Sequence, residues 1–316
     1  MSPVEPELPQ LSTGLSSFSP DDPGTWQPLL DRALSADRAG LDRIVVSDHV
    51  VFGEHLEAYG QPELGGSAGG KQPTGPDGHW LDPLTTLSVM AGMTSRVRLG
   101  TNILLAALRR PAVLAKMAAT LDVLSGGRLD LGVGVGWQRE EYDAAGLDFE
   151  RRGELLDHAL AVCQTLWREQ SASYSDEWLS FEHIHQMPKP TRPGGVPIWV
   201  SGTVNRRVAR RLARFGSGWI PWGPAAADPA SGIAGMRKLL EAEGADPSGL
   251  QVVGTLRAVK TDDNIDLDAT MAQVPALVDA GVTDFRINPV LPPDLDAATD
   301  ELARVVRAFR AAAGRS

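Results

Sequence analysis

Apolar and polar positions alternate along the chain in a regular way. Short runs rich in Val, Ile and Leu predict buried strands, and the longer stretches between them have the amphipathic spacing of helices. The predicted strands lie near residues 12–18, 42–47, 96–104, 128–135, 197–201, 217–221, 250–259 and 283–288. The predicted helices lie near residues 25–39, 83–94, 111–124, 151–169, 204–215, 230–243, 267–280 and 296–312. This alternation indicates a parallel sheet built from repeated strand–helix units.

The evenness of the alternation favours a closed (β/α)8 TIM barrel over an open, doubly wound sheet. The units continue without a boundary linker to the last amphipathic helix, so we expect one domain over residues 1–316. Gly40 and Gly281 stand where predicted helices end, which is the usual place for a helix-terminating glycine. Two segments, 53–81 and 171–196, interrupt the rhythm and are expected to be elaborated loops.

Composition narrows the classes of partner. The formal net charge is -10 without a basic tail, and such a surface repels nucleic-acid phosphates and anionic lipids. No apolar run approaches the roughly 20 residues that cross a bilayer. The first residues carry acids where a signal peptide carries basic residues. The single cysteine, Cys163, lies in an apolar helical stretch and is expected to be a reduced core residue. The sequence therefore predicts a cytoplasmic protein that binds neither nucleic acid nor membranes.

In a (β/α)8 barrel the chemistry lies where strands end and the following loops begin. Ser47, Asp48 and His49 directly follow the apolar run 44–46, which puts an acid and an imidazole at the barrel mouth. A titratable pair at this position suggests proton transfer. The residues alone leave open a simpler interpretation, in which Asp48 caps a turn and His49 bonds to a backbone carbonyl.

Two other strand ends are rich in glycine. The glycine in the stretch 100–102 indicates a bulge or a close approach of the backbone to a ligand. From 132 to 136 every second residue is glycine, and Trp137 follows, so one face of that strand carries no side chains. Either a flat ligand or larger neighbouring side chains could fill this space. The spacing does not match a dinucleotide-binding fingerprint, because no glycine stands at the required sixth position.

A fourth strand end, 201–203, precedes a helix predicted to begin near Val204. Free N–H groups at a helix start can hold an anion. Arg206 and Arg207 would oppose the helix dipole unless an anion or acidic neighbours offset them. A bound phosphate and an ordinary solvated basic face both account for this pattern.

Metal and nucleophile chemistry have weaker support. His183 and His185 would share one face of a strand, but no third ligand is placed with them, so no metal site is predicted. Cys163 falls within a helix, and Ser201 lacks the glycine pattern of a nucleophile elbow. The residues therefore favour neither a metal site nor a nucleophilic mechanism.

The segment from Pro111 to Trp137 is similar throughout to the third helix and fourth strand of the luciferase-like flavin and deazaflavin superfamily. Further stretches resemble that family in the same order and spacing, namely 39–42, 47–49, 197–202 and 215–219. The chain is identified as a member of the luciferase-like monooxygenase superfamily from Gly40 to its last helix. The resemblance implies a TIM barrel that binds a flavin or deazaflavin ring at its carboxyl mouth, where reduced cofactor transfers a hydride or activates oxygen.

The choice of cofactor follows from the branch of the family. The chain is rich in Ala and Arg and poor in Lys, as in the actinobacterial-looking branch that uses the deazaflavin coenzyme F420. We expect an F420-dependent oxidoreductase that acts on a small organic substrate. An FMN-dependent luciferase-like monooxygenase is the alternative, and a flavin-binding protein without activity is a third hypothesis.

The resemblance also implies roles by position. His49 is the candidate catalytic residue, a proton donor or acceptor that borders the ring together with Asp48. Thr101 and Asn102 match a strand end where relatives often hold a non-proline cis peptide bond behind the ring. The remaining expected cofactor-binding residues match the fourth strand end and the phosphate cradle: Gly134, Gly136, Trp137, Ser201, Gly202, Thr203 and Val204.

One departure bears on the substrate. Trp137 stands where related F420-dependent sugar-phosphate dehydrogenases hold a glutamate, which speaks against glucose 6-phosphate. Together with Trp80, Trp178, Trp219 and Trp222 it could line an apolar pocket, although tryptophan is as often part of a core. Family members commonly pair through barrel helices, so a homodimer is expected. The long loop that begins at residue 53 could close over the substrate as a lid.

Overall fold

The computed structural model describes residues 9–64, 66–261 and 265–315. The acidic start of the chain, on which the expectation of a protein without a signal peptide depends, lies outside these residues. No helix in the described ranges is long and apolar enough to cross a bilayer.

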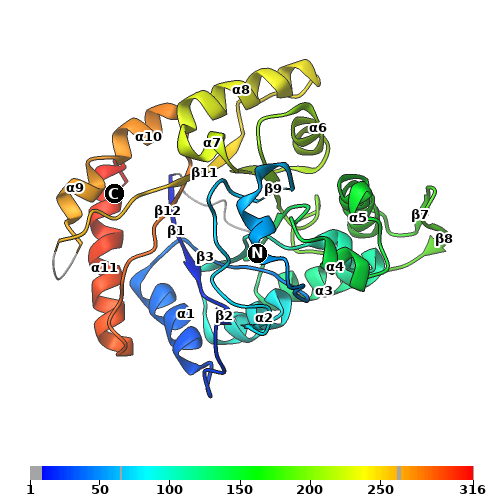
Figure 1. The fold of residues 1–316 in the computed structure, drawn as a ribbon. Coiled ribbons are helices and arrows are strands. Elements are labelled where there is room, and N and C mark those ends of the chain that lie inside the picture. Colours follow the sequence, from blue (N-terminus) through cyan, green and yellow to red (C-terminus); the bar gives the residue numbers. More distant parts are fainter. Residues whose placement is uncertain (1–8, 65, 262–264, 316) are drawn as a thin grey trace.

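Eight parallel strands close into a barrel, which confirms the predicted fold (Figure 1). Around the barrel the order is β1, β12, β11, β10, β9, β6, β5, β3, and β3 pairs with β1 to close the ring. The strands are β1 (Gln10–Leu15), β3 (Arg43–Val46), β5 (Arg98–Thr101), β6 (Leu129–Val133), β9 (Ile198–Gly202), β10 (Gly218–Pro221), β11 (Gln251–Thr255) and β12 (Asp284–Arg286).

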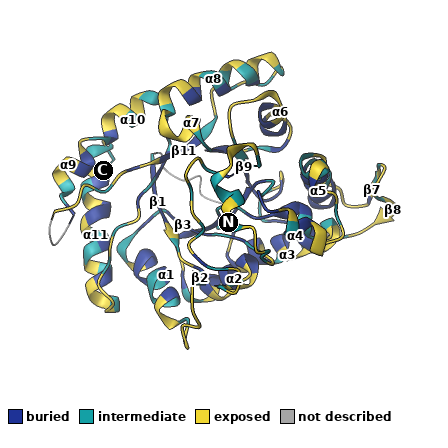
Figure 2. Ribbon diagram, in the orientation of Figure 1, coloured by how far each residue is buried: buried dark blue, intermediate teal, exposed yellow. Residues whose placement is uncertain are grey.

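Helices surround the barrel and turn their buried faces toward the strands, while the outer faces are exposed (Figure 2). They are α1 (Gln27–Ala39), α2 (Pro83–Met93), α3 (Pro111–Leu124), α5 (Arg152–Arg168), α6 (Arg206–Phe215), α8 (Pro229–Ala242), α9 (Leu267–Met271), α10 (Val274–Ala280) and α11 (Leu295–Ala312). Gly40 and Gly281 end α1 and α10 with φ angles of 81° and 100°, as their positions predicted.

Two strand boundaries differ from the prediction. The first strand is 10–15 and not 12–18, because the polar Gln10 pairs with Asp284 and belongs to the barrel. The predicted strand 250–259 ends at 255. Beyond that point the chain turns toward α9, where the backbone N–H of Val259 donates to Thr270 Oγ1 at 2.9 Å.

Two helix boundaries also differ. The predicted helix 267–280 is divided into α9 and α10, because Pro275 in the first turn of α10 has no N–H to donate to the preceding turn. The helix expected to begin near Val204 begins two residues later. Asn205 caps it by accepting a hydrogen bond from the N–H of Val208 at 3.0 Å.

The two interrupting segments carry structure of their own outside the barrel. The first contains two 3₁₀ turns and the strand β4, which pairs with the short β2 after the first barrel strand; the second contains the hairpin β7–β8. These and the remaining short elements are β2 (Phe18–Ser19), β4 (His79–Trp80), β7 (Ala172–Ser175), β8 (Ser180–Ile184), α4 (Arg139–Ala144) and α7 (Pro224–Ala227).

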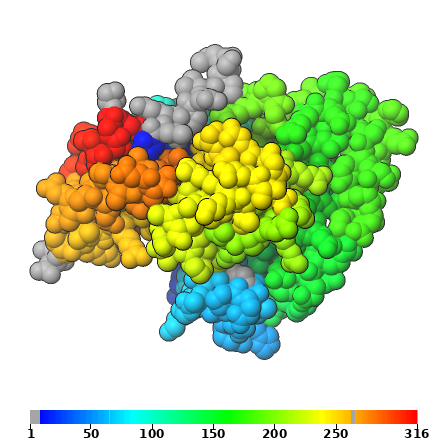
Figure 3. Space-filling view, turned by 90° about the horizontal axis from the view of Figure 1, so that it is seen from above, coloured from blue at the N-terminus to red at the C-terminus, as the bar shows by residue number. Residues whose placement is uncertain are grey.

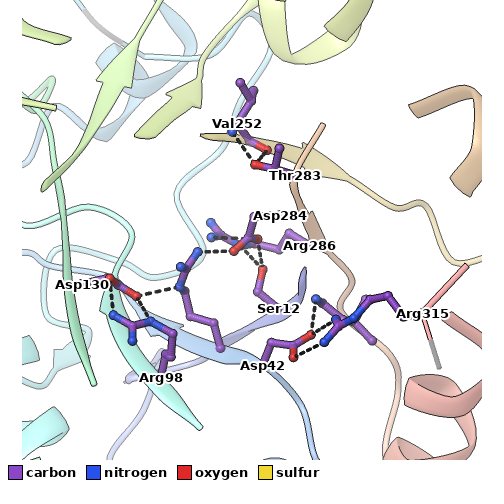
Figure 4. A network of polar contacts seen from close by, with 11 residues as sticks. Ser12, Asp42, Arg98, Asp130, Val252, Thr283, Asp284, Arg286 and Arg315 are labelled. Carbon is purple, nitrogen blue, oxygen red and sulfur yellow. Dashed lines mark hydrogen bonds and ion pairs between the residues drawn. The ribbon is translucent and has the colours of Figure 1, made fainter. Parts of the chain in front are cut away.

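A charged layer fills the barrel interior near the amino ends of the strands (Figure 4). Arg98 donates to both oxygens of Asp130, at 2.6 and 2.7 Å, and Arg43 Nε donates to Asp130 at 3.0 Å. Arg43 also pairs with Asp284 and lies 4.3 Å above the ring of Trp199. Burial would raise the pKa of Asp130, but Arg43 and Arg98 outweigh it and hold that pKa below its ordinary value. The layer therefore ties β3, β5, β6 and β12 together where most barrels carry aliphatic side chains.

Candidate active site

A cavity of about 690 Å³ opens at the carboxyl ends of the barrel strands. Its walls come from the ends of β1, β3 and β5, from the first turns of α1 and from the loop after β12. Aliphatic and aromatic side chains line most of it, together with a few polar groups. This volume and lining are typical of a site for a small organic ligand or a cofactor ring.

Two buried polar atoms at the strand ends of this cavity lack partners. Ser47 Oγ and Asn102 Oδ1 make no hydrogen bond to any residue that the structure describes. The Asn102–Ile103 peptide bond is cis, at the strand end where the family resemblance implied such a bond. Burial of an unpaired polar atom is unfavourable, so both atoms are suited to hydrogen-bond with a bound molecule.

Asp48 lies at the mouth, but its carboxylate is already engaged. Its side chain is fully buried, and it accepts hydrogen bonds from the backbone N–H of Leu105 at 2.8 Å and from Arg109 at 2.6 and 3.0 Å. Arg109 also pairs with Asp82, the residue that caps α2, at 2.8 Å. These contacts favour a structural role for Asp48, whose carboxylate ties the end of β3 to the chain after β5. They disfavour direct contact of this carboxylate with a ring.

His49 is enclosed by aromatic rings, and its side chain is only 11% exposed. Ring centroids lie 4.4 Å from Phe52, 4.7 Å from Trp80 and 6.0 Å from Trp137. Its Nδ1 lies 3.3 Å from Glu141 Oε1, whereas Nε2 makes no hydrogen bond within the described part of the chain. The ring is thus held by one nitrogen and has the other available to a ligand.

Two residues at the start of α4 hold the backbone that follows this histidine. Glu141 Oε1 accepts from the N–H of Val50 at 2.8 Å, and Gln138 Oε1 accepts from the N–H of Gly53 at 2.8 Å. Gln138 Nε2 donates to the carbonyl of Val51 at 2.9 Å. The glutamate side chain is completely buried, and its Oε2 lacks a partner among the described residues. Neither residue was predicted from the sequence, although their spacing of three, just after a glycine-rich strand end, puts them on one helix face.

The contact between Glu141 and His49 predicts a tautomer. Because the carboxylate faces Nδ1, we expect the neutral ring to carry its proton on Nδ1 and to present the Nε2 lone pair to the mouth. Glu141→Gln retains an acceptor oxygen and should retain this tautomer. Glu141→Met removes the acceptor, so the Nδ1–H tautomer should no longer be favoured. Long-range proton–nitrogen NMR correlations report the tautomer directly. The signal of His49 is identified as the one that is missing in His49→Gln. An Nε2–H tautomer in the unmodified protein would contradict the assignment.

The side of the stretch 132–136 that lacks side chains, at and just beyond the end of β6, is filled by neighbouring side chains of the protein. A Cβ atom on Gly134 would lie 2.8 Å from Ile103 Cδ1, and one on Gly136 would lie 2.8 Å from Leu105 Cδ2. Gly136 also has a φ angle of 72°, which side chains rarely adopt. The interpretation that larger neighbours occupy this face therefore holds, and contact of the two glycines with a cofactor stays a prediction.

Thr101 serves the barrel in the same region. It is buried, and its Oγ1 donates to the carbonyl of Gly132 at 2.7 Å. A Cβ on Gly132 would lie 2.0 Å from the carbonyl oxygen of Thr101, so only glycine permits this approach of β5 and β6. The hydroxyl of Thr101 is thus committed to the sheet.

The stretch 201–204 comprises the last two residues of β9 and the first two of the loop to α6, as the phosphate-cradle prediction requires. Thr203 and Val204 are exposed, and their backbone N–H groups make no hydrogen bond to described residues. Gly202 has a φ angle of 155°, and a Cβ atom built on it would lie 2.6 Å from Val208 Cγ2. Free N–H groups of this kind suit an anion.

Three arginines of α6 pair with acidic side chains, so their placement does not require a bound phosphate. Arg206 and Arg210 pair with Glu243 at 3.4 and 3.3 Å, and Arg211 pairs with Asp157 at 2.5 Å. Of the two arginines in the dipole argument, Arg206 therefore has its acidic neighbour, whereas Arg207 forms no ion pair with the residues that the structure describes.

The tryptophans do not form one pocket. Trp80 and Trp137 flank the histidine, and Trp137 Nε1 is buried without a partner among the described residues. Trp219 is fully buried in the core, and Trp178 packs against His158 of α5. Only the first two are placed to contact a ligand near the histidine.

The segment 53–81 lies over part of the mouth. The ring of Tyr59 is 5.5 Å from that of Trp137, and Trp222 Nε1 donates to the carbonyl of Gly66 at 2.8 Å. In Figure 3 its residues project as the light-blue group beside the yellow-green residues that follow β10. Closure of this segment as a lid stays a prediction.

The described residues provide neither a metal site nor a reactive cysteine. Within the described ranges, no three side chains of His, Cys, Asp or Glu are grouped so as to hold a metal ion. Burial raises the pKa of Cys163 to about 12, so its thiol is a poor nucleophile.

The fold and the site define a class of protein, a (β/α)8 barrel with a ligand cavity and an enclosed histidine at its carboxyl mouth. The profile of the luciferase-like monooxygenase family matches residues 11–315, and the chain belongs to this family. The resemblance noted from the sequence is thereby confirmed.

Curated relatives include proteins with and without a known activity. An uncharacterised protein of Mycobacterium tuberculosis is 36% identical over 140 residues, which cover 44% of this chain and 49% of that protein. The F420-dependent glucose-6-phosphate dehydrogenase of Kineococcus radiotolerans is 32% identical over 196 residues, which cover 61% of this chain and 51% of the dehydrogenase. The chain thus spans about half the length of these relatives.

Solved structures show the same fold with both kinds of cofactor. An F420-dependent secondary alcohol dehydrogenase in complex with an F420–acetone adduct has a TM-score of 0.69 and 17% identity, covering 95% of this chain and 99% of that one. The oxygenating constituent of the 3,6-diketocamphane monooxygenase of Pseudomonas putida, in complex with FMN, has a TM-score of 0.69 and 15% identity, covering 95% and 98%. At these identities the likeness shows the fold alone.

Proposed function

We propose that the protein is an F420-dependent oxidoreductase that transfers a hydride between the deazaflavin and a small organic substrate. The observation that carries the proposal is the pair of unpartnered polar atoms, Ser47 Oγ and Asn102 Oδ1, at strand ends that also present His49. A flat ring edged with carbonyl and N–H groups has the donors and acceptors that these atoms lack. The relative at 32% identity that uses F420 supports the choice of the deazaflavin over FMN.

The residues present fit such a group. Ser47 and Asn102 would hold the edge of the ring, and the free N–H groups of Thr203 and Val204 would hold its phosphate. When bound, the deazaflavin supplies a ring carbon that accepts or gives up a hydride.

His49 supplies the matching proton chemistry. With an alcohol substrate, Nε2 takes the hydroxyl proton as the neighbouring carbon loses its hydride and a carbonyl forms; the reverse reaction returns the proton. Glu141 holds Nδ1 and so keeps Nε2 directed at the substrate. The surrounding aromatic rings exclude water, which strengthens polar interactions within the site.

An FMN-dependent monooxygenase is the second candidate. The enclosure of His49 by Phe52, Trp80 and Trp137 favours it, because oxygen chemistry on a reduced flavin requires a site closed to water. Exclusion of glucose 6-phosphate by Trp137, a homodimer and a cytoplasmic location also remain predictions.

Titration with the two oxidised cofactors separates the candidates. We expect F420 to quench the tryptophan fluorescence of the protein and to bind at least about tenfold more tightly than FMN, a difference of roughly 1.4 kcal/mol. Isothermal calorimetry on the same samples controls for light absorption by the cofactors. Tighter binding of FMN would favour the monooxygenase, and binding of neither would contradict both candidates.

A further inference from the structure

The cavity at the barrel mouth has an uneven distribution of charge. Of the residues that line it, Arg32 alone carries a charge, and no lining residue is acidic. Most of the others are apolar, including Phe18, Trp26, Leu29 and Leu291. An apolar chamber with one cationic group in its wall discriminates among ligands by their charge.

The guanidinium of Arg32 lacks a counter-ion. Its Nη2 donates to the carbonyl of Leu291 at 3.0 Å, and among the described residues it forms no ion pair. Desolvation lowers the pKa of Arg32, and the neighbouring Asp31 offsets this only in part. Asp31 is itself engaged, since its Oδ1 accepts from Gln27 Nε2 at 2.8 Å. The protein therefore leaves a partly buried positive charge in the cavity wall without a carboxylate to balance it.

The backbone near Arg32 adds to the positive potential of the cavity wall. The first turn of α1 contributes Trp26, Pro28 and Leu29 to the cavity wall, so the positive end of that helix dipole adds to the charge of Arg32. Ser47 and Asn102, where the proposed ring binds, line the same cavity at the ends of β3 and β5. A ligand can thus extend from the strand ends to the side chain of Arg32.

We propose that this cavity binds a substrate with an apolar body and one anionic oxygen group, most simply a carboxylate, which pairs with Arg32. The apolar body lies against the aromatic and aliphatic wall, and the reacting carbon points toward Ser47 and Asn102. This assignment of substrate class rests on the proposed function for the reaction, but the anion site itself does not depend on it.

The anionic group could instead belong to the cofactor, whose phosphate also carries negative charge. The free N–H groups of Thr203 and Val204 already provide a place for that phosphate, at the end of β9. In the ring order β9 stands four strands from β1, on the opposite side of the barrel from the cavity wall formed by β1 and α1. A charge at Arg32 is therefore better placed for the substrate.

Binding of a matched pair of probes tests the proposal without any turnover. Decanoate and its neutral isostere decanamide are titrated by calorimetry into the full chain without cofactor. We expect decanoate to bind at least about tenfold more tightly, the size of one charge-assisted hydrogen bond. In Arg32→Met this preference should disappear, and in Arg32→Lys part of it should return. Arg38→Met is the matched control, because Arg38 lies on the same helix outside the cavity and pairs with Asp296.

A second titration, with oxidised F420, identifies which ligand the charge serves. Unchanged F420 affinity in Arg32→Met, with loss of the preference for decanoate, supports the substrate site. Weaker F420 binding with an unaltered preference for decanoate assigns the charge to the cofactor and overturns the proposal. Failure of the unmodified protein to bind decanoate, or equal binding of both probes, also overturns it. A decanoate site that depends on Arg32 in a protein that binds no F420 would support the anion site and reject the proposed function.

Discussion

Replacement of Asp130 by asparagine is expected to lower the free energy of unfolding by about 3–5 kcal/mol. The carboxylate of Asp130 is shared between Arg43 and Arg98 inside the barrel, so its neutralisation leaves the buried Arg98 without a carboxylate and Arg43 with Asp284 as its remaining partner. Urea denaturation followed by circular dichroism measures the change. Asp296→Asn is the matched control, because Asp296 is 88% exposed in a surface pair with Arg38 and should cost less than about 1 kcal/mol.

The same substitution should alter the response to acid. The pKa of Asp130 is lowered in the folded protein, while in the unfolded chain it is near 3.9. The pairing therefore stabilises the protein fully above about pH 4 and is lost as the pH falls through the folded pKa. The difference in stability between the unmodified protein and Asp130→Asn should narrow on acidification below that pH. A difference that stays constant would show that the ionised carboxylate is not the stabilising species.

Replacement of His49 by glutamine is expected to slow turnover by about 10²–10⁴-fold, the usual contribution of a positioned proton donor or acceptor. Glutamine can still donate to Glu141 and fill much of the space between the aromatic rings, but it cannot exchange a proton. Turnover is followed by the change in visible absorbance of oxidised F420 with an active substrate from a screen of alcohols and carboxylates. F420 affinity should change little, because the proposed ring contacts are Ser47 and Asn102.

His55→Gln provides the matched control for this experiment. His55 lies six residues further along the same loop, is 78% exposed, and pairs only with Glu57 in the described structure. It should retain full activity. Equal rates for His49→Gln and the unmodified protein would remove the histidine from the mechanism and leave a role in binding alone.

The barrel could be predicted from the sequence because its determinants are local. Each strand is a short apolar run and each helix has its own amphipathic period, so the order of elements follows without tertiary information. The charged layer could not be predicted in this way. Arg43, Asp130 and Asp284 occupy the amino ends of strands, where polar residues normally indicate that a strand has not yet begun. Only closure of the barrel turns these positions inward.

The candidate site shows the same contrast between residues that local sequence identifies and residues that only the tertiary structure places in the site. His49, Asn102 and Ser201 were found because they follow apolar runs and therefore stand at the barrel mouth. Glu141 was missed because its contacts are to Val50 and His49, more than 90 residues earlier in the chain. Arg32 was missed for a similar reason, since it looks like one more surface residue of an amphipathic helix until the loop after β12 is placed against it.

The position of the cavity has a consequence for how this fold can diversify. The wall that carries Arg32 belongs to the β1 side of the ring, whereas the free N–H groups after β9 stand across its diameter. Substitutions in α1 or in the loop after β12 can therefore remodel one rim while the opposite rim keeps its backbone geometry. With the substrate at Arg32 and the cofactor phosphate after β9, as proposed, substrate preference and cofactor retention become separable traits, and descendants of one ancestor can exchange the first without giving up the second.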